Sequence, residues 1–216
     1  MGFLEKLFGK KKTETNKTSQ DSQHWEICTA PDVPQPFGFK TGWLAIKGET
    51  PQSVIEDLQL KDTETANWKS GMEVAYYTDH KVFVSPEVDG YVLVIGLLDL
   101  SLKQIEEIAK KFQEVQYFLS HRIVDVYSWT KFQKGKLIRH YYFIGESGEV
   151  SSQGAFTQQE QELGLEHLLC SEDQDWDDAK LPDEETVLSV AAAWGVDPLM
   201  QKHKEEKSVG FLCTGL

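Results

Sequence analysis

Two histidine–arginine pairs are the residues of this 216-residue chain best suited to chemistry. His121 precedes Arg122, Arg139 precedes His140, and no other arginine occurs in the sequence. A histidine can act as a general base near neutral pH, and a neighbouring arginine can stabilise an anion. Asp125 follows the first pair and supplies a carboxylate to orient such a base. The pattern therefore admits a small-molecule-binding protein or hydrolase that uses His121, Arg139 and His140.

The motifs that would make an enzyme assignment specific do not occur in the sequence. There is no dinucleotide-binding Gly-x-Gly-x-x-Gly and no nucleophile elbow. The run Gly9-Lys-Lys-Lys-Thr13 lacks the spacing and the preceding strand of a phosphate-binding loop. His167 and Cys170 are closely spaced, but a structural zinc site needs four ligands. We therefore expect no metal and no cofactor, and we favour a non-catalytic function.

Two strand-like segments lie at the histidine–arginine pairs. One follows His121–Arg122 closely, and the other contains Arg139–His140. Residues 124–131 and 136–144 flank Lys134-Gly135, which predicts an antiparallel hairpin. With these two residues as the turn, Trp129 would pair with His140 and Tyr127 with Tyr142. The side chains expected on one face are then Asp125, Tyr127, Trp129, His140 and Tyr142. If exposed, this face would be a partner-binding surface; if buried, His140 would be a hydrogen-bonded core residue.

The charge of the chain restricts the class of partner. It has 35 acidic and 22 basic residues and a formal net charge of −13. Residues 146–185 hold thirteen of the carboxylates and one lysine. Such a surface repels phosphate, and two arginines are few for nucleic-acid recognition. We therefore expect no nucleic-acid partner and favour another protein. The favoured interpretation of the acidic segment is a solvated loop, and the alternative is a docking surface for a basic protein.

Cysteine usage and hydropathy predict the compartment. Three widely spaced cysteines without a Cys-x-x-Cys pair fit a reducing environment. Residues 1–25 lack the apolar stretch of a secretory signal, and the longest apolar run, Tyr91 to Leu98, is too short to span a bilayer. These features predict a cytoplasmic protein.

The first twelve residues predict a short amphipathic helix with four apolar side chains on one face and lysines after it. The residues concerned are Phe3, Leu4, Leu7, Phe8, Lys10, Lys11 and Lys12. This run resembles the opening of bacterial cytoplasmic proteins that touch the inner leaflet, and such helices lie in membrane interfaces. Residues 13–24 have no aliphatic residue and predict a flexible tether. The favoured interpretation is a frayed terminus or a helix docked on its own domain; the alternative is weak peripheral contact with the inner membrane.

Residues 25–216 predict a single α+β domain with a mostly antiparallel sheet and a few packed helices, acidic and helical from about residue 146. Capping patterns at Thr50-Pro51, Ser101–Gln104 and Thr157–Glu160 mark helix starts. The run 91–98 does not alternate, which is typical of a central strand. Strands are expected at 25–29, 43–47, 72–78, 81–85, 91–98, 124–131, 136–144 and 209–213, and helices from Pro51, at 102–113, 158–164 and 182–194, and from Pro198. The function indicated is that of a non-catalytic bacterial accessory protein, regulatory or immunity-type, that binds another macromolecule.

Overall fold

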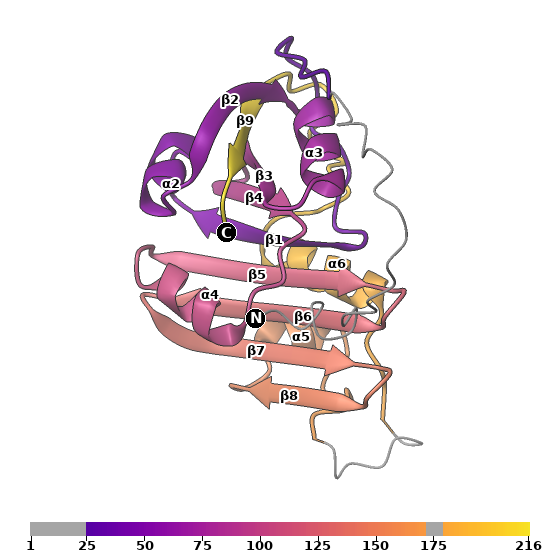
Figure 1. Ribbon diagram of the computed structural model, residues 1–216. Coiled ribbons are helices and arrows are strands. Elements are labelled where there is room, and N and C mark those ends of the chain that lie inside the picture. Colours follow the sequence, from indigo (N-terminus) through magenta and orange to yellow (C-terminus); the bar gives the residue numbers. More distant parts are fainter. Residues whose placement is uncertain (1–24, 172–178) are drawn as a thin grey trace, which may run out of the picture.

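An antiparallel sheet organises the chain, as a computed structural model that describes residues 25–171 and 179–216 shows (Figure 1). Nine strands within these residues pair in the order β2-β9-β3-β4-β1-β5-β6-β7-β8, and every neighbouring pair is antiparallel. The strands are β1 (Thr41–Lys47), β2 (Lys61–Asn67), β3 (Lys81–Val88), β4 (Tyr91–Gly96), β5 (Glu114–His121), β6 (Val126–Gln133), β7 (Lys136–Ile144), β8 (Glu149–Gln153) and β9 (Val209–Thr214). The predicted mostly antiparallel α+β architecture is confirmed.

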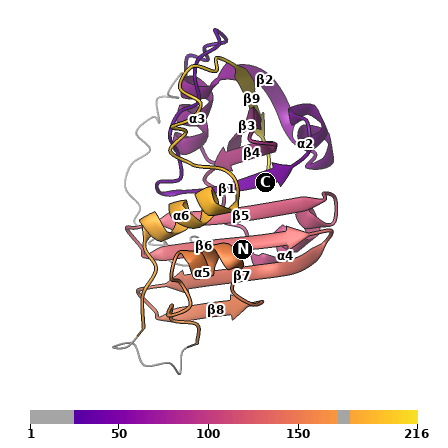
Figure 2. The ribbon, with the colours of Figure 1, turned by 180° about the vertical axis from the view of Figure 1, so that it is seen from behind.

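Helices cover both faces of the sheet (Figures 1 and 2). They are α2 (Pro51–Asp57), α3 (Trp68–Tyr77), α4 (Leu102–Ala109), α5 (Gln158–Glu162) and α6 (Glu184–Trp194). The α2 and α4 helices lie on one face, and α3, α5 and α6 lie on the other. The predicted caps at Thr50, Ser101 and Thr157 are present, each closing a reciprocal capping box that satisfies backbone N–H groups of the first turn.

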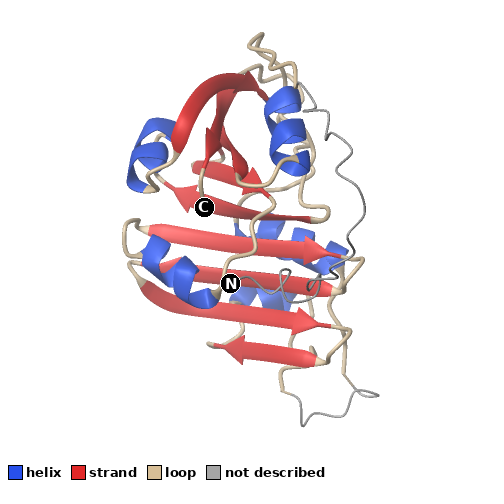
Figure 3. Ribbon diagram, in the orientation of Figure 1, coloured by secondary structure: helices blue, strands red, loops and turns tan. Residues whose placement is uncertain are grey.

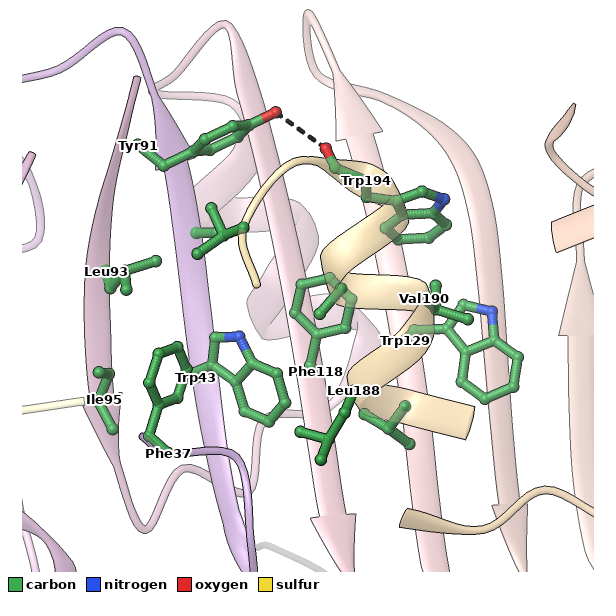
Figure 4. Close-up of a cluster of buried hydrophobic side chains, with 14 of the residues drawn as sticks. Phe37, Trp43, Tyr91, Leu93, Ile95, Phe118, Trp129, Leu188, Val190 and Trp194 are labelled. Atoms are coloured by element: carbon green, nitrogen blue, oxygen red, sulfur yellow. Dashed lines mark hydrogen bonds between the residues drawn. The ribbon is translucent and has the colours of Figure 1, made fainter. Parts of the chain in front are cut away.

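Each face of the sheet has its own apolar core because side chains alternate along the strands. Trp43 and Ala45 of β1 point to the α6 side, and Leu44 and Ile46 point to the α4 side. Aromatic rings dominate the α6 side, where Trp43 stacks on Phe118 with ring centroids 5.0 Å apart (Figure 4). Every residue of β4 is buried, which confirms the central strand predicted from the non-alternating run.

Several predicted elements are wrong, each for a local reason. Residues 72–78, expected as a strand, belong mostly to α3, whose first backbone N–H groups donate to Asp32 and whose Asn67 cap accepts from Ser70 (Figure 3). Residues 25–29 form no strand, and the segment after Pro198 forms turns instead of a helix. The β2 strand escaped prediction because its first five residues are exposed and mostly polar.

The amphipathic segment and tether predicted for residues 1–24, and residues 172–178 of the acidic run, lie outside the described residues. Among the helices that are described, none is both long and apolar enough to cross a bilayer.

Candidate functional site

The hairpin of β6 and β7 does not have the predicted register. Its turn is Lys134-Gly135 as expected, since Gln133 pairs with Lys136. A β-bulge between Lys131 and Phe132 then shifts the pairing, so that Trp129 lies opposite Tyr141 and Thr130 opposite His140. The predicted pairs of Trp129 with His140 and of Tyr127 with Tyr142 are therefore wrong, because one extra residue on β7 turns each following side chain to the other face.

Four of the five residues expected on one face are divided between the sides of the two cores, and the fifth is exposed. Tyr127 and Trp129 belong to the core under α5 and α6, where Trp129 is fully buried. Tyr142 packs against the opposite core, on the face that it shares with His140. Asp125 is exposed next to the strand and accepts a hydrogen bond from the Tyr127 hydroxyl at 3.3 Å. The structure does not bring these side chains together as one exposed patch.

Arg139 is committed to a buried ion pair. Its Nε donates to Oε1 of Glu160 at 2.8 Å, and both side chains are fully buried. Its Nη1 donates to Ser152 Oγ at 2.8 Å, and its guanidinium lies over the Phe156 ring. The same Glu160 oxygen accepts the indole N–H of Trp129 at 2.8 Å. Arg139 is therefore a structural charge and is not available to a ligand.

His140 is also removed from solvent. It is 6% exposed, and its Nδ1 lies 2.8 Å from Oγ1 of Thr130. Burial, with a further contribution from the charge of Arg139, lowers the pKa of His140 to about 4. The imidazole is therefore neutral near neutral pH, which makes it a hydrogen-bonded part of the core.

A polar cleft of about 580 Å³ opens where β1 begins and where β4 and β5 end. His121 lines this cleft at the end of β5. The other polar side chains that line it come from the segment before β1, the α3–β3 turn, the β4–α4 connection and α4. They are Lys40, Asp79, His80, Asp99 and Gln104, and apolar walls are formed by Leu97, Leu98 and Leu119.

An aromatic groove of about 320 Å³ adjoins the cleft on the α3 side. Thr41 lines both hollows and donates a hydrogen bond from Oγ1 to the carbonyl of Gly96 at 2.5 Å. The groove runs between α3 and the segment before β1. Its apolar lining is Pro36, Phe37, Phe39, Met72, Tyr76, Tyr77 and Ile95.

Close packing of the backbone shapes the boundary between the two hollows. The chain leaves β4 and crosses in front of β1 and β5 to reach α4 (Figure 1). A Cβ atom at Gly42 would overlap the carbonyl oxygen of Leu98, so a glycine is required for this crossing. The crossing is held by the Tyr117 hydroxyl, which donates to the Leu98 carbonyl at 3.0 Å.

The two histidine–arginine pairs do not converge. Arg122 is exposed and lies 3.6 Å from a carboxylate oxygen of Glu184 at the start of α6. His121 pairs with Val126 at the end of β5, whereas His140 pairs with Thr130 in the middle of β7. Of the residues in these pairs, His121 alone lines one of the two hollows.

Apart from His121, sequence reasoning missed the residues that line these hollows. Tyr76 and Tyr77 were assigned to a strand, and Lys40, Asp79 and His80 come from separate turns without a motif. In residues 25–171 and 179–216, no three His, Cys, Asp or Glu side chains gather in a way that would hold a metal ion. Comparison with known proteins finds no matching family model, no similar curated protein and no similar solved structure.

The change Glu160→Gln should strongly destabilise the fold. It removes the counter-charge of a fully buried guanidinium while nearly preserving shape, and breaking such a pair typically costs about 3–5 kcal/mol. Urea unfolding followed by tryptophan fluorescence measures the change. The control Glu162→Gln alters an exposed carboxylate of the same helix and should cost no more than about 0.5 kcal/mol. Equal unfolding midpoints for the two variants would contradict the importance of the pair.

His140 should make the protein less stable as the pH falls. Its pKa is about 4 in the folded protein, below the usual 6.5, so the contribution of neutral His140 is present above pH 6.5 and is lost as the pH falls toward 4. Between about pH 7.5 and pH 5 this loss amounts to about 2 kcal/mol. The free energy of unfolding of the wild type should therefore decrease more over this range than that of His140→Gln. Parallel pH curves for the two proteins would rule this out.

Proposed function

We propose that this chain is a non-catalytic accessory protein of the regulatory or immunity type, which binds another protein through the polar cleft and the aromatic groove. One observation carries the proposal. Nine large apolar side chains are exposed in the described residues, and four of them line these two adjoining hollows: Phe39, Tyr77, Leu97 and Leu216. Tyr77 is 66% exposed, Leu97 44% and Phe39 42%. Clustered exposed apolar groups with a polar rim are typical of interaction sites.

The charge of the body supports a basic partner. Residues 1–24 contain five lysines and three carboxylates, so residues 25–216 carry a net charge of −15. Glu73 lines the groove, and Asp79 and Asp99 line the cleft. Such a field accelerates encounter with basic proteins and repels acidic ones. A partner segment with apolar anchors and flanking lysines or arginines complements both hollows.

A second candidate function is binding of a small molecule in the polar cleft. Its volume of about 580 Å³ falls in the usual range of ligand pockets. His121 contributes a buried Nδ1 that has no hydrogen-bond partner in the described residues. Binding or hydrolysis at this place would use His121 and His80, since Arg139 and His140 lie within the cores.

We further propose that the protein is cytoplasmic and touches the inner membrane weakly through residues 1–12. The support is the sequence of that segment alone, in which the spacing of four apolar side chains would place them on one face of a helix, with lysines beside them. The small apolar face and the acidic body both favour reversible attachment over a stable one.

Partner binding should depend on Tyr77. We would capture proteins from a lysate of the source organism, purify a basic one that is recovered, and titrate it against the full chain by calorimetry. Tyr77→Asp should weaken this binding at least about tenfold, which corresponds to about 1.4 kcal/mol. The matched control Ile123→Asp alters an apolar residue of similar exposure, 68%, in the β5–β6 turn and outside both hollows, and should leave binding unchanged. Equal weakening by both variants, or by neither, would refute the proposed surface.

Membrane contact should require residues 1–12. In co-sedimentation with phosphatidylglycerol vesicles at low salt, the full chain should pellet more than a version that lacks residues 1–12. Because each lysine near an anionic surface contributes about 1 kcal/mol, added salt should abolish the difference. Phosphatidylcholine vesicles are the uncharged control. Equal pelleting of the two proteins at low salt would disprove the contact.

A further inference from the structure

We propose that residues 1–12 of this chain cover the aromatic groove when neither a partner nor a membrane is bound. The inference deepens the proposed function and rests on the groove being a binding surface, since it names the segment that a partner must displace. It commits to one occupant, the amphipathic N-terminal segment of the same molecule.

The groove has the shape and chemistry that an amphipathic helix needs. Met72, Glu73, Tyr76 and Tyr77 follow the i, i+1, i+4, i+5 spacing of one face of α3, and all four line the groove. The opposite wall contains Phe37 and Phe39, and Ile95 of β4 also contributes apolar surface. Aromatic and methionine side chains between a helix and a second wall form the kind of groove that binds an apolar helix face.

The chain enters the described structure beside this groove. The Trp25 ring stacks on the Tyr77 ring with centroids 5.9 Å apart and an interplanar angle of 11°. Farther along, the Cys28 carbonyl accepts from the Asn67 backbone N–H at 2.7 Å, and Asp32 accepts from the Trp68 N–H, also at 2.7 Å. Residues 25–32 therefore run from the C-terminal end of α3 to its N-terminal end. The preceding residues join the body at the end of α3 that carries Tyr76 and Tyr77.

The chemistry of the segment complements the groove and its surroundings. Phe3, Leu4, Leu7 and Phe8 have the same i, i+1, i+4, i+5 spacing, which in a helix would give a small apolar face. Four lysines and one glutamate give residues 1–12 a net charge of +3, whereas residues 25–216 carry −15. The segment is therefore a basic, apolar-anchored peptide, which is the class of ligand inferred above for a partner.

The tether makes even a weak contact effective. Residues 13–24 form a twelve-residue link with no aliphatic residue, for which a flexible chain has a root-mean-square span of about 19 Å. A short link of this kind gives an effective concentration in the millimolar range, well above that of a second molecule in a dilute sample. The segment of the same chain is therefore favoured over that of another copy.

Methyl NMR of the full chain, labelled on methionine with carbon-13, tests this directly. The sequence contains Met1, Met72 and Met200, of which Met72 lines the groove and Met200 is buried outside its lining. The double change Phe3→Asp/Phe8→Asp should shift the Met72 signal by more than a linewidth, because it removes the aromatic rings from the groove. The matched control Thr13→Asp/Thr18→Asp adds the same charge to the tether and should leave Met72 in place. An unchanged Met200 signal verifies that the fold is intact.

Coincident Met72 signals in the wild type and the Phe3→Asp/Phe8→Asp variant would overturn the inference. A wild-type Met72 signal that moves to the variant position on dilution would also overturn it, because a second copy would then be the occupant. The outcome for the proposed function is separate. If Met72 responds as expected but no partner depends on Tyr77, the docking stands and the proposed function fails. If both are right, the Phe3→Asp/Phe8→Asp variant should bind the partner more tightly than the wild type.

Discussion

The buried pair of Arg139 and Glu160 connects the core of the sheet to the surface that we propose as the binding site. Glu160 holds the guanidinium through one carboxylate oxygen and accepts the Thr157 backbone N–H with the other, at 2.8 Å. Thr157 in turn accepts the indole N–H of Trp194 at 3.2 Å, which attaches α5 to α6. At the other end of α6, Glu184 accepts from the Lys40 backbone N–H and the Ser120 hydroxyl. The position of the segment before β1, a wall of both hollows, thus depends on α6 and through it on the buried charge.

A second polar cluster secures the C-terminal end of α6 in the same manner. The Tyr91 hydroxyl lies 3.2 Å from the Trp194 carbonyl (Figure 4). It also donates to Glu114 at 2.9 Å. Burial alone would raise the pKa of Glu114, but the hydrogen bond from Gln116 and the charge of Lys131 lower it, so the carboxylate stays ionised. Burial and the bond to Glu114 raise the pKa of Tyr91, which keeps its hydroxyl protonated as a donor. Polar residues on β5 can therefore be covered by α6 without unpaired charge.

Local signals of the sequence predicted the parts of the fold that depend on local physics. Capping residues such as Ser101 act on backbone groups within three positions, and the Lys134-Gly135 turn requires only its own two residues. The strand at 114–121 was missed because its buried polar residues, Glu114 and Gln116, find their partners in distant elements. The bulge in β7 was equally invisible, because it turns Arg139 to the face covered by α5, where its partner Glu160 lies in a distant part of the sequence. The hollows combine residues from turns and strand ends that only the tertiary structure brings together.

The histidine–arginine pairs illustrate why a suggestive spacing in sequence need not produce a site. Neighbouring residues of a strand point to opposite faces, so Arg139 and His140 cannot reach one ligand while both remain in β7. Arg139 pairs with Glu160 on the face covered by α5, and His140 contacts Thr130 on the opposite face. His121 differs from His140 because it stands at the end of β5, where it borders a cleft open to solvent. Recognition in this protein is therefore expected at strand ends and at the end of α3, where side chains are free of the alternation that commits residues within the sheet to its two cores.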